Sequence, residues 1–369
     1  MLSFILWDTA PEILAAFSDE PAFGVRWYGL FFASAFLVGQ FIMAHILKTE
    51  KQPARELDAI SVYMVAAVVI GARLGHCLFY EPGYFLSHPI EILKVWKGGL
   101  ASHGATAGIL FGIWLYARNR NKSYLGTLDR LVITIALGGA LIRFGNLMNS
   151  EIIGKPADAP QTFVFARSAH DVVKENFGTQ VKLSGISRTG KDTLVKGIHY
   201  PKLRMDFTFA PGIINHAAVD NFLKSNLPDA MRGYSETNDN YRFFDAVPQT
   251  VISEQNKVIT AALFVYGVPR HPAQLYEALT CIVLFLLLLY LWNRWRENTP
   301  PGSLFGIFVI WVFTLRFFYE FLKENQVEFE NNLPLNMGQY LSIPLILAGI
   351  IVTWMAFTGR TQKQVSTKN

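Results

Sequence analysis

The stretch from Leu137 to Gly154, LGGALIRFGNLMNSEIIG, is the segment that decides the fold class of this chain. It begins as an apolar run with small residues and then places Arg143, Asn146, Asn149 and Glu151 near its end. On a helix, residues three positions apart share a face, so Arg143 and Asn146 are predicted to stand side by side. The stretch therefore predicts a helix that ends in a polar cluster.

An arginine inside an apolar span is costly unless it meets a partner, a cavity or an anionic ligand, so Arg143 marks a candidate functional site. The alternative is that its long side chain extends to the lipid headgroups. The amides and the carboxylate beside it favour a polar pocket over this alternative.

The composition of the whole chain is that of a polytopic membrane protein. Of its 369 residues, 51% are hydrophobic and only 17% are charged, and apolar runs of spanning length recur. The net charge of +5 does not indicate nucleic-acid binding, because the basic residues fall in short loops between apolar runs. The two cysteines, Cys77 and Cys281, are too few for a disulfide framework and are expected to be buried free thiols. The acidic N-terminal segment lacks the basic start of a cleaved signal peptide, so the first apolar run is expected to stay in the membrane.

Seven apolar runs have the length of about 18–24 residues that a tilted transmembrane helix needs. They cover residues 24–47, 57–80, 99–117, 126–148, 272–293, 303–323 and 338–357. A polar region, residues 149–271, separates the fourth run from the fifth, and its short apolar run Val258–Val265 is predicted to be a strand. The predicted fold is an all-α polytopic membrane protein with seven transmembrane helices and a mixed α/β insertion between the fourth and the fifth.

Basic residues that follow the first, third, fifth and seventh runs set the predicted orientation. They are Lys48, Lys51, Arg55, Arg118, Arg120, Lys122, Arg294, Arg296, Arg360, Lys363 and Lys368. The opposite side carries the acidic N-terminal segment and Glu324, Glu328 and Glu330. By the positive-inside rule the N-terminus lies outside and the C-terminus in the cytoplasm. The predicted parts are helices 1–4 (1–148), a periplasmic insertion (149–271), helices 5–7 (272–357) and a cytoplasmic tail (358–369).

Polar residues recur in all seven predicted helices, in the half of the membrane that faces outward. They are Arg26, Tyr28, Arg73, His76, His103, Arg143, Asn146, Arg270, His271, Gln274, Tyr276, Glu277, Arg316, Glu320 and Gln339. Independent side chains that each extend to the surface would also give this pattern, but several of them lie too deep to reach water. The pattern therefore favours one shared cavity that opens outward.

Arg143, Arg316 and Arg73, with Asn146 and His103, would give this cavity an anion site. A guanidinium matches phosphate oxygens, and a phosphate at this depth of a bilayer belongs to a phospholipid headgroup. His103 ordinarily titrates near neutrality and is a candidate to move a proton, with a histidine that only bonds a neighbouring helix as the alternative. The sequence has no metal-ligand spacing and no nucleotide-binding motif, so neither a metal nor a cofactor is expected.

Several segments resemble the prolipoprotein diacylglyceryl transferase family. The segment IRFGNLMNSEIIG is similar to the family pattern G-R-x-G-N-F-x-N-x-E-x-x-G. Six further family-like segments follow the family's order: VRWYGL (25–30), GARLG (71–75), GGLASHG (98–104), RHPAQLYE (270–277), LRFFYEF (315–321) and MGQYLSIP (337–344). Together they touch all seven predicted helices, which makes the resemblance specific.

The resemblance implies a multi-pass enzyme of the bacterial inner membrane whose active site faces the periplasm. It implies transfer of the diacylglyceryl group of phosphatidylglycerol to the lipobox cysteine of a preprolipoprotein, giving a thioether and glycerol phosphate. It also implies which residues act. The catalytic set is Tyr28, His103, Arg143 and Arg316, and the set that binds the phosphatidylglycerol headgroup is Arg143, Asn146, Glu151, Gly154, Arg316 and Glu320.

The chain departs from the family pattern at several positions. Ile142 replaces a glycine, Leu147 replaces an aromatic residue, and Ala105 replaces the second glycine after the histidine. The region 149–271 is also longer than the family usually has. These departures concern local packing and the role of the insertion, and not the implied reaction.

Two other functions use the same features. A transporter or flippase for an anionic lipid would also need buried arginines, but such proteins usually show repeated halves, which this sequence lacks. A structural or receptor-like membrane protein would use polar residues to lock its helices together, but it would not need all of them in the outer half.

Overall fold

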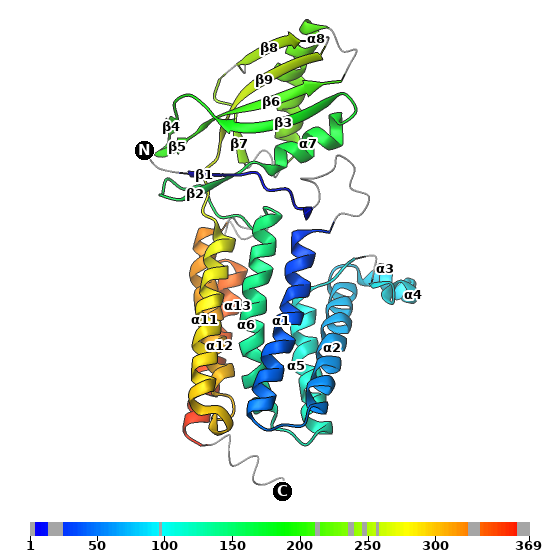
Figure 1. Ribbon diagram of the computed structural model, residues 1–369, viewed down its shortest axis with the longest axis vertical. Helices are drawn as coiled ribbons and strands as arrows, with labels where there is room; N and C mark the ends of the chain where they lie inside the picture. The colour runs from blue at the N-terminus through cyan, green and yellow to red at the C-terminus, as the bar shows by residue number, and fades with distance from the viewer. Residues whose placement is uncertain are drawn as a thin grey trace. The chain divides into compact units, whose positions relative to one another are not determined.

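The computed structural model describes residues 4–13, 25–95, 98–210, 215–234, 240–245, 249–255, 258–323 and 333–359. The chain folds into two compact units (Figure 1). The head unit comprises Met1–Leu30, Arg143–Tyr276 and Tyr319–Glu328, and the helical unit comprises Phe31–Ile142, Glu277–Phe318 and Phe329–Asn369. The predicted tail from Arg360 onward and the acidic residues Glu324, Glu328 and Glu330 lie outside the described residues.

Each of the seven predicted spans is a helix. Their bounds are α1 Trp27–Thr49, α2 Arg55–Phe79, α5 Ser102–Asn119, α6 Tyr124–Met148, α11 Ala273–Trp295, α12 Ser303–Tyr319 and α13 Met337–Phe357. In the described part of the chain, six of these helices are long and apolar enough to cross a membrane, and α5 is not among them. A multi-pass membrane protein is thus confirmed, whereas the seventh crossing and the orientation stay predictions.

Helix α5 packs against α2 through glycines. A Cβ atom added at Gly75 would lie 2.6 Å from the Cα of Gly104, and one added at Gly108 would lie 2.9 Å from the Cα of Gly71. The two backbones therefore touch directly, in the close approach that small residues permit between helices in a membrane. Figure 1 shows α2 and α5 side by side. The cysteines are free, with Cys77 buried and Cys281 half-buried.

A buried ion pair joins three helices where α1 ends. Glu50 accepts a hydrogen bond from Arg130 Nε at 3.1 Å and another from the Trp292 indole at 2.8 Å. Only 9% of Glu50 and 1% of Trp292 are exposed, so this network fixes the end of α1 against α6 and α11. Buried charges are tolerated when they are paired in this way.

Asp129 of α6 fixes the start of α12. Its carboxylate accepts hydrogen bonds from the backbone N–H groups of Gly302 at 2.6 Å and Phe305 at 2.8 Å. The first N–H groups of a helix have no partner within the helix, and a carboxylate is a favourable cap for them. Asp129 is fully buried, so a neighbouring helix supplies the cap that the sequence before α12 does not.

An antiparallel sheet forms the core of the head unit. Its strands are β3 Val181–Arg188, β6 Lys202–Phe209, β7 Tyr241–Arg242, β8 Thr250–Gln255 and β9 Val258–Gly267. Strand β9 pairs with β6 along one edge and with β7 and β8 along the other. The strand predicted at Val258–Val265 is therefore confirmed, and it is the central element of the sheet.

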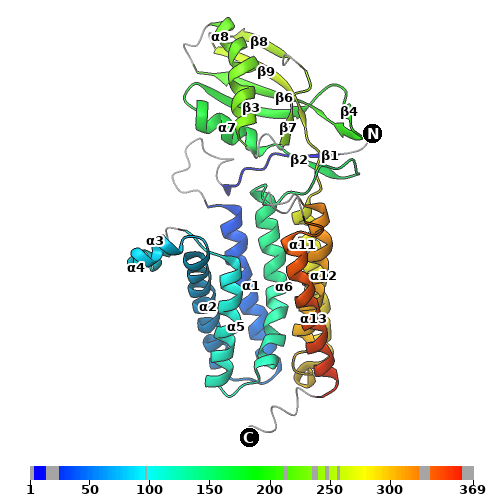
Figure 2. The same cartoon turned by 180° about the vertical axis from the view of Figure 1, so that it is seen from behind.

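One face of the sheet is covered by helices. Along β6 the side chains alternate, and Leu203, Met205, Phe207 and Phe209 are buried while the residues between them are more exposed. The buried side chains pack against α7 Arg167–Phe177, α8 His216–Asn221 and α9 Leu227–Gly233, which lie over this face (Figure 2). The insertion is mixed α/β, as predicted.

The end of α6 also belongs to the head unit. Strand β1, Phe4–Trp7, pairs in parallel with β2, Thr162–Phe165. The Trp7 indole donates a hydrogen bond to the carbonyl of Leu147 at 2.9 Å, and both residues pack with Phe163. This cluster fixes the last turn of α6, which carries the polar cluster of the opening stretch.

Candidate active site

The polar residues at the end of α6 form one hydrogen-bonded chain. Arg143 Nη1 donates to Asn146 Oδ1 at 3.3 Å, and Asn146 Nδ2 donates to Glu151 Oε2 at 3.1 Å. Asn149 Nδ2 donates to the other carboxylate oxygen of Glu151 at 3.0 Å. The sequence spacing predicted that Arg143 and Asn146 would share a face, and their hydrogen bond confirms it.

The chemistry of the three groups determines which of them donates and which accepts each hydrogen bond. An arginine can only donate hydrogen bonds and an ionised carboxylate can only accept them. The amide of Asn146 therefore presents its oxygen to Arg143 and its nitrogen to Glu151. Asn146 is 5% exposed, whereas Glu151 is exposed to solvent. The buried amide therefore links Arg143 to a carboxylate at the surface and orients the guanidinium.

The turn after α6 brings Glu151 back toward the helix. Ser150 has φ of 56° and Ile152 has φ of 55°, both in the left-handed region. This region is especially unfavourable for a β-branched isoleucine and costs about 1–3 kcal/mol per residue. Strain of this kind persists only where the surrounding structure enforces it.

Two fully buried side chains from the segment RHPAQLYE enforce the turn. Gln274 Nε2 donates to the carbonyl of Glu151, and Arg270 Nη1 donates to the carbonyl of Gly154 at 2.9 Å. Gln274 is 0% exposed and Arg270 is 1% exposed. The sequence placed both residues among the outer polar set, but it did not identify them as supports of this turn. The family-like segment that contains them is the signal that could have done so.

Gly154 is the point where three segments of the head unit meet. Its N–H donates to the carbonyl of His271 at 3.1 Å, and the next N–H, of Lys155, donates to the carbonyl of Leu322 at 2.7 Å. A Cβ atom at position 154 would lie 2.5 Å from the His271 carbonyl oxygen and 3.1 Å from that of Leu322. Only glycine fits there, so the structure gives Gly154 a packing role beside the predicted headgroup-binding residues.

Tyr28 lies next to the polar chain. A Cβ atom at Gly145 would lie 2.8 Å from Tyr28 Cδ2, so the ring packs directly on α6 one residue before Asn146. The structure thus brings Tyr28, Arg143, Asn146, Glu151 and Gly154 together within the head unit.

His103 and Arg316 belong to the helical unit, and Glu320 belongs to the head unit. His103 is the second residue of α5, is exposed, and lies against the rings of Phe79 and Tyr80, with centroids 5.1 Å and 5.9 Å away. Arg316 lies in the last turn of α12, and Glu320 begins the short 3₁₀ helix Glu320–Leu322. Their approach to Arg143 stays a prediction.

The structure contradicts the prediction that Arg73 contributes to the anion site. Only 5% of Arg73 is exposed, and its guanidinium donates hydrogen bonds to four backbone carbonyls, those of Glu91, Ile92, Gly98 and Gly99. It also lies over the ring of Phe85, 5.0 Å from the centroid. Arg73 therefore holds the segment between α2 and α5 in place.

Another histidine, His271, lies next to Gly154 in the head unit. His271 is half-buried, and burial lowers the pKa of its imidazole, so the ring is uncharged at neutral pH. Its Nδ1 lies 3.3 Å from the hydroxyl of Tyr276. An uncharged imidazole is able to accept a proton, so the head unit contains a titratable group beside Gly154.

Three buried polar atoms near the turn have no hydrogen-bond partner among the described residues. They are Asn149 Oδ1, Ser150 Oγ and Gln274 Oε1. Buried polar groups in folded proteins are normally satisfied, so each of these atoms is available to a ligand or to water. The two amide oxygens can only accept hydrogen bonds, and they suit a ligand with hydroxyl donors.

Comparison with known proteins decides the family. A model of the prolipoprotein diacylglyceryl transferase family matches residues 15–355. The chain belongs to this family. The family assignment covers the head unit and the helical unit alike.

Three relatives carry the name phosphatidylglycerol–prolipoprotein diacylglyceryl transferase. The protein of Chloroherpeton thalassium is 33% identical over 96% of this chain and 95% of its own length. That of Tolumonas auensis is 34% identical over 94% and 96%, and that of Bacteroides fragilis is 30% identical over 98% and 97%. Each match takes in nearly the whole of both chains, so the region 149–271 is not an addition relative to these family members.

Membership in a transferase family does not favour the lipid-transporter alternative. It agrees with the resemblance carried by the segments around Arg143 and Gly154.

Proposed function

We propose that the protein transfers the sn-1,2-diacylglyceryl group of phosphatidylglycerol to the lipobox cysteine thiol of a preprolipoprotein. The products are a thioether and glycerol phosphate, and the reaction is the first step of bacterial lipoprotein maturation. The observation that carries the proposal is the chain from Arg143 through Asn146 to Glu151, within a member of this transferase family.

The bonds and charges of the reaction define what the site must do. The sulfur attacks the glyceryl carbon that bears the phosphate ester, the C–O bond breaks, and its electron pair leaves with the phosphate. The thiol must first lose its proton, because the thiolate is the nucleophile. One negative charge therefore passes from sulfur to the leaving phosphate, and the site must stabilise that charge where it develops.

Arg143 and Arg316 bind the phosphate and stabilise the charge that accumulates on it. A guanidinium can donate two parallel hydrogen bonds to phosphate oxygens, but only if its plane is correctly set. Asn146 and Glu151 set that plane for Arg143, and Tyr28 supports the same turn of α6. Glu320 is assigned to the same headgroup network. His103 accepts the thiol proton and would act as the general base.

The glycerol hydroxyl groups of the headgroup are donors for the buried acceptors at the turn. Asn149 Oδ1 and Gln274 Oε1 are buried and can accept from hydroxyl groups. A glycerol headgroup offers such donors without a positive charge, whereas an ethanolamine headgroup brings an ammonium group close to Arg143. This arrangement supports phosphatidylglycerol as the donor lipid.

The proposed topology has seven transmembrane helices in the bacterial inner membrane, with α5 crossing against α2. The N-terminus and residues 149–271 lie in the periplasm, the C-terminus lies in the cytoplasm, and the active site is open to the outer leaflet. The contiguous parts are helices 1–4 (1–148), the insertion, helices 5–7 (272–357) and the tail (358–369). The distribution of basic residues supports this orientation.

The test supplies purified protein with phosphatidylglycerol labelled in its diacylglyceryl group and with a lipobox peptide. We expect a thioether-linked diacylglyceryl peptide, detected by mass spectrometry. Arg143→Ala should lower the transfer rate by at least about 10²–10³-fold while the protein stays folded. Arg204→Ala is the matched control, because this arginine is exposed on β6 and pairs with Asp206. Labelled lipid that moves between leaflets without any peptide product would instead indicate a transporter.

A further inference from the structure

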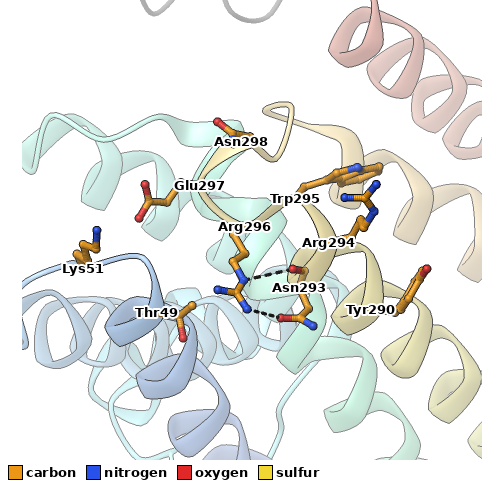
Figure 3. Close-up of a pocket in the computed structure, with 9 residues that line it drawn as sticks. All are labelled: Thr49, Lys51, Tyr290, Asn293, Arg294, Trp295, Arg296, Glu297 and Asn298. Atoms are coloured by element: carbon orange, nitrogen blue, oxygen red, sulfur yellow. Dashed lines mark hydrogen bonds between the residues drawn. The ribbon is translucent and has the colours of Figure 1, made fainter.

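A pocket with a volume of about 580 Å³ lies where α1 and α11 end (Figure 3). Its lining is polar and basic. The residues are Thr49, Lys51, Tyr290, Asn293, Arg294, Trp295, Arg296, Glu297 and Asn298. All of them belong to the helical unit. None takes part in the site around Arg143.

The charge of the lining favours an anionic ligand. Lys51, Arg294 and Arg296 are cations, and Glu297 is the one acidic residue in the lining. Asn293, Asn298 and Thr49 add neutral polar groups that can donate hydrogen bonds. Two guanidinium groups among the cations suit phosphate oxygens, which they can bind in pairs.

The pocket has fixed walls. Figure 3 shows Arg296 between Thr49 of α1 and Asn293 of α11, and its Nε and Nη2 donate to the backbone and side-chain oxygens of Asn293, each at 3.3 Å. Glu50 and Trp292 are joined by the buried network with Arg130. Glu50 lies between the lining residues Thr49 and Lys51, and Trp292 lies between Tyr290 and Asn293, so the two helix ends are held together without a ligand.

Aromatic residues place the pocket at the boundary between lipid and water. Both α1 and α11 are helices that could cross a membrane, and they end at the pocket. Tyr290 is 65% exposed on the apolar side of the lining, and Trp295 is half-buried at the end of α11. Tyrosine and tryptophan are enriched at this level of membrane proteins, where one end of the ring meets lipid and the other meets headgroups.

We propose that this pocket binds the phosphate of an anionic phospholipid from the leaflet in which α1 and α11 end. Basic pockets between transmembrane helices are suited to anionic headgroups. The site is distinct from the proposed donor-lipid site, because Tyr28 and Thr49 stand at opposite ends of α1. Those positions are 21 residues apart on one helix, which is about 30 Å. A lipid bound there would brace the ends of α1 and α11, which the ion pair of Glu50 already joins.

A soluble phosphate compound shares the headgroup chemistry, and the surroundings favour the lipid. The exposed ring of Tyr290 continues into the apolar surface of α11, where Leu286 is 56% exposed and Val283 is 51% exposed. An acyl chain could lie along these residues while the phosphate meets the basic lining. A soluble phosphate gains nothing from that apolar surface.

The test titrates lipid onto the full chain and counts bound lipid by native mass spectrometry. All proteins carry Arg143→Ala to weaken the donor site, and the lipid is phosphatidylglycerol, compared with phosphatidylethanolamine of the same acyl chains. The test protein carries Lys51→Gln, Arg294→Gln and Arg296→Gln. Because these three cations would each give up a charge-assisted hydrogen bond to the phosphate, we expect the affinity for phosphatidylglycerol to fall by at least about a hundredfold.

The matched control carries Lys48→Gln, Arg55→Gln and Arg118→Gln. These exposed cations lie at the same end of the helices and outside the pocket, and their removal lowers the net charge equally. We expect the control to keep its affinity within about threefold. Equal losses of affinity in the two triple variants, or equal binding of both lipids, would contradict the proposed site. Competition by soluble glycerol phosphate as strong as that by lipid would overturn its assignment to a phospholipid.

A gain of affinity gives an independent check that does not depend on lost binding. Glu297→Gln removes the one acidic residue of the lining, so we expect phosphatidylglycerol to bind about fivefold more tightly. Asp58→Asn is the control, because Asp58 is an exposed acid in the first turn of α2 and does not line the pocket. Equal affinity in the Glu297→Gln and parent proteins would contradict the proposal.

Discussion

Replacing Asn146 with aspartate tests the hydrogen-bonded chain with the smallest possible change in shape. The amide accepts from Arg143 and donates to Glu151, at 3.3 Å and 3.1 Å. An aspartate at this position can still accept from Arg143, but it has no hydrogen to donate to Glu151. Two carboxylate oxygens would then face each other where a hydrogen bond had been.

The expected size of the effect follows from the geometry. The lost bond is a hydrogen bond to a charged group, which contributes about 1.5–3 kcal/mol. The two like charges about 3.1 Å apart add a repulsion of about 5 kcal/mol at an effective dielectric constant of 20. Water that reaches the exposed Glu151 reduces the repulsion, so a total of about 2–5 kcal/mol is expected. If this loss falls on the transition state, kcat/KM for phosphatidylglycerol decreases by at least about thirtyfold.

The assay is diacylglyceryl transfer at several pH values, with Asn146→Asp compared with the parent protein. As the pH falls, a proton shared by the two carboxylates restores the missing donor, so the deficit should shrink on the acidic side. Asn221→Asp is the matched control, because this exposed amide lies at the end of α8, outside the proposed site, and its side chain bonds Asn226. It should lose much less activity. An Asn146→Asp enzyme within about threefold of the parent at neutral pH would refute the orienting role of the amide.

Three further changes test other parts of the structure. His103→Gln should slow transfer by about 10²–10⁴-fold, and near-normal rates in this variant would eliminate the role of His103 as general base. Gly104→Val drives a side chain into the backbone of α2 and should cost about 1–3 kcal/mol, seen as a lower melting temperature in detergent. Burial raises the pKa of Asp158 but hydrogen bonds from His199 outweigh it, so the net pKa is lowered. The ionised carboxylate therefore stabilises the fold above a pH of about 4, and this contribution is lost at lower pH. Asp158→Asn should lower the free energy of unfolding, measured by denaturant titration, at neutral pH and leave it unchanged in acid.

The membrane helices could be predicted from the sequence because the length of an apolar run fixes them. The predicted runs and the helices agree to within a few residues at most ends, as at 126–148 against Tyr124–Met148. Helix α5 shows where this signal weakens. The polar residues at its two ends, among them His103, Arg118 and Asn119, lower the hydropathy that identifies a span.

The candidate site was predicted in part. Helical spacing placed Arg143 beside Asn146, and the structure confirms that contact. The link to Glu151 depends on left-handed backbone at Ser150 and Ile152, which a sequence pattern gives no reason to expect at an isoleucine. Arg73 was wrongly assigned to the anion site, because its partners are main-chain carbonyls about 20 residues further along the chain, and side-chain patterns do not reveal them.

The depth of Arg316 relative to α6 depends on a contact at the opposite end of α12. Asp129 caps the first N–H groups of α12, which fixes the axial position of that helix against α6. Gly306 and Gly349 then fix its packing against α13, since a Cβ atom at Gly349 would lie 2.9 Å from Ile310 Cγ1. Arg316 lies 13 residues after Ser303, so a rise of about 1.5 Å per residue puts it about 20 Å along the axis. A one-turn slip of α12 would move the arginine by about 5 Å, more than the reach of a hydrogen bond, so the buried carboxylate sets the depth at which Arg316 would meet the phosphate that we propose as its ligand.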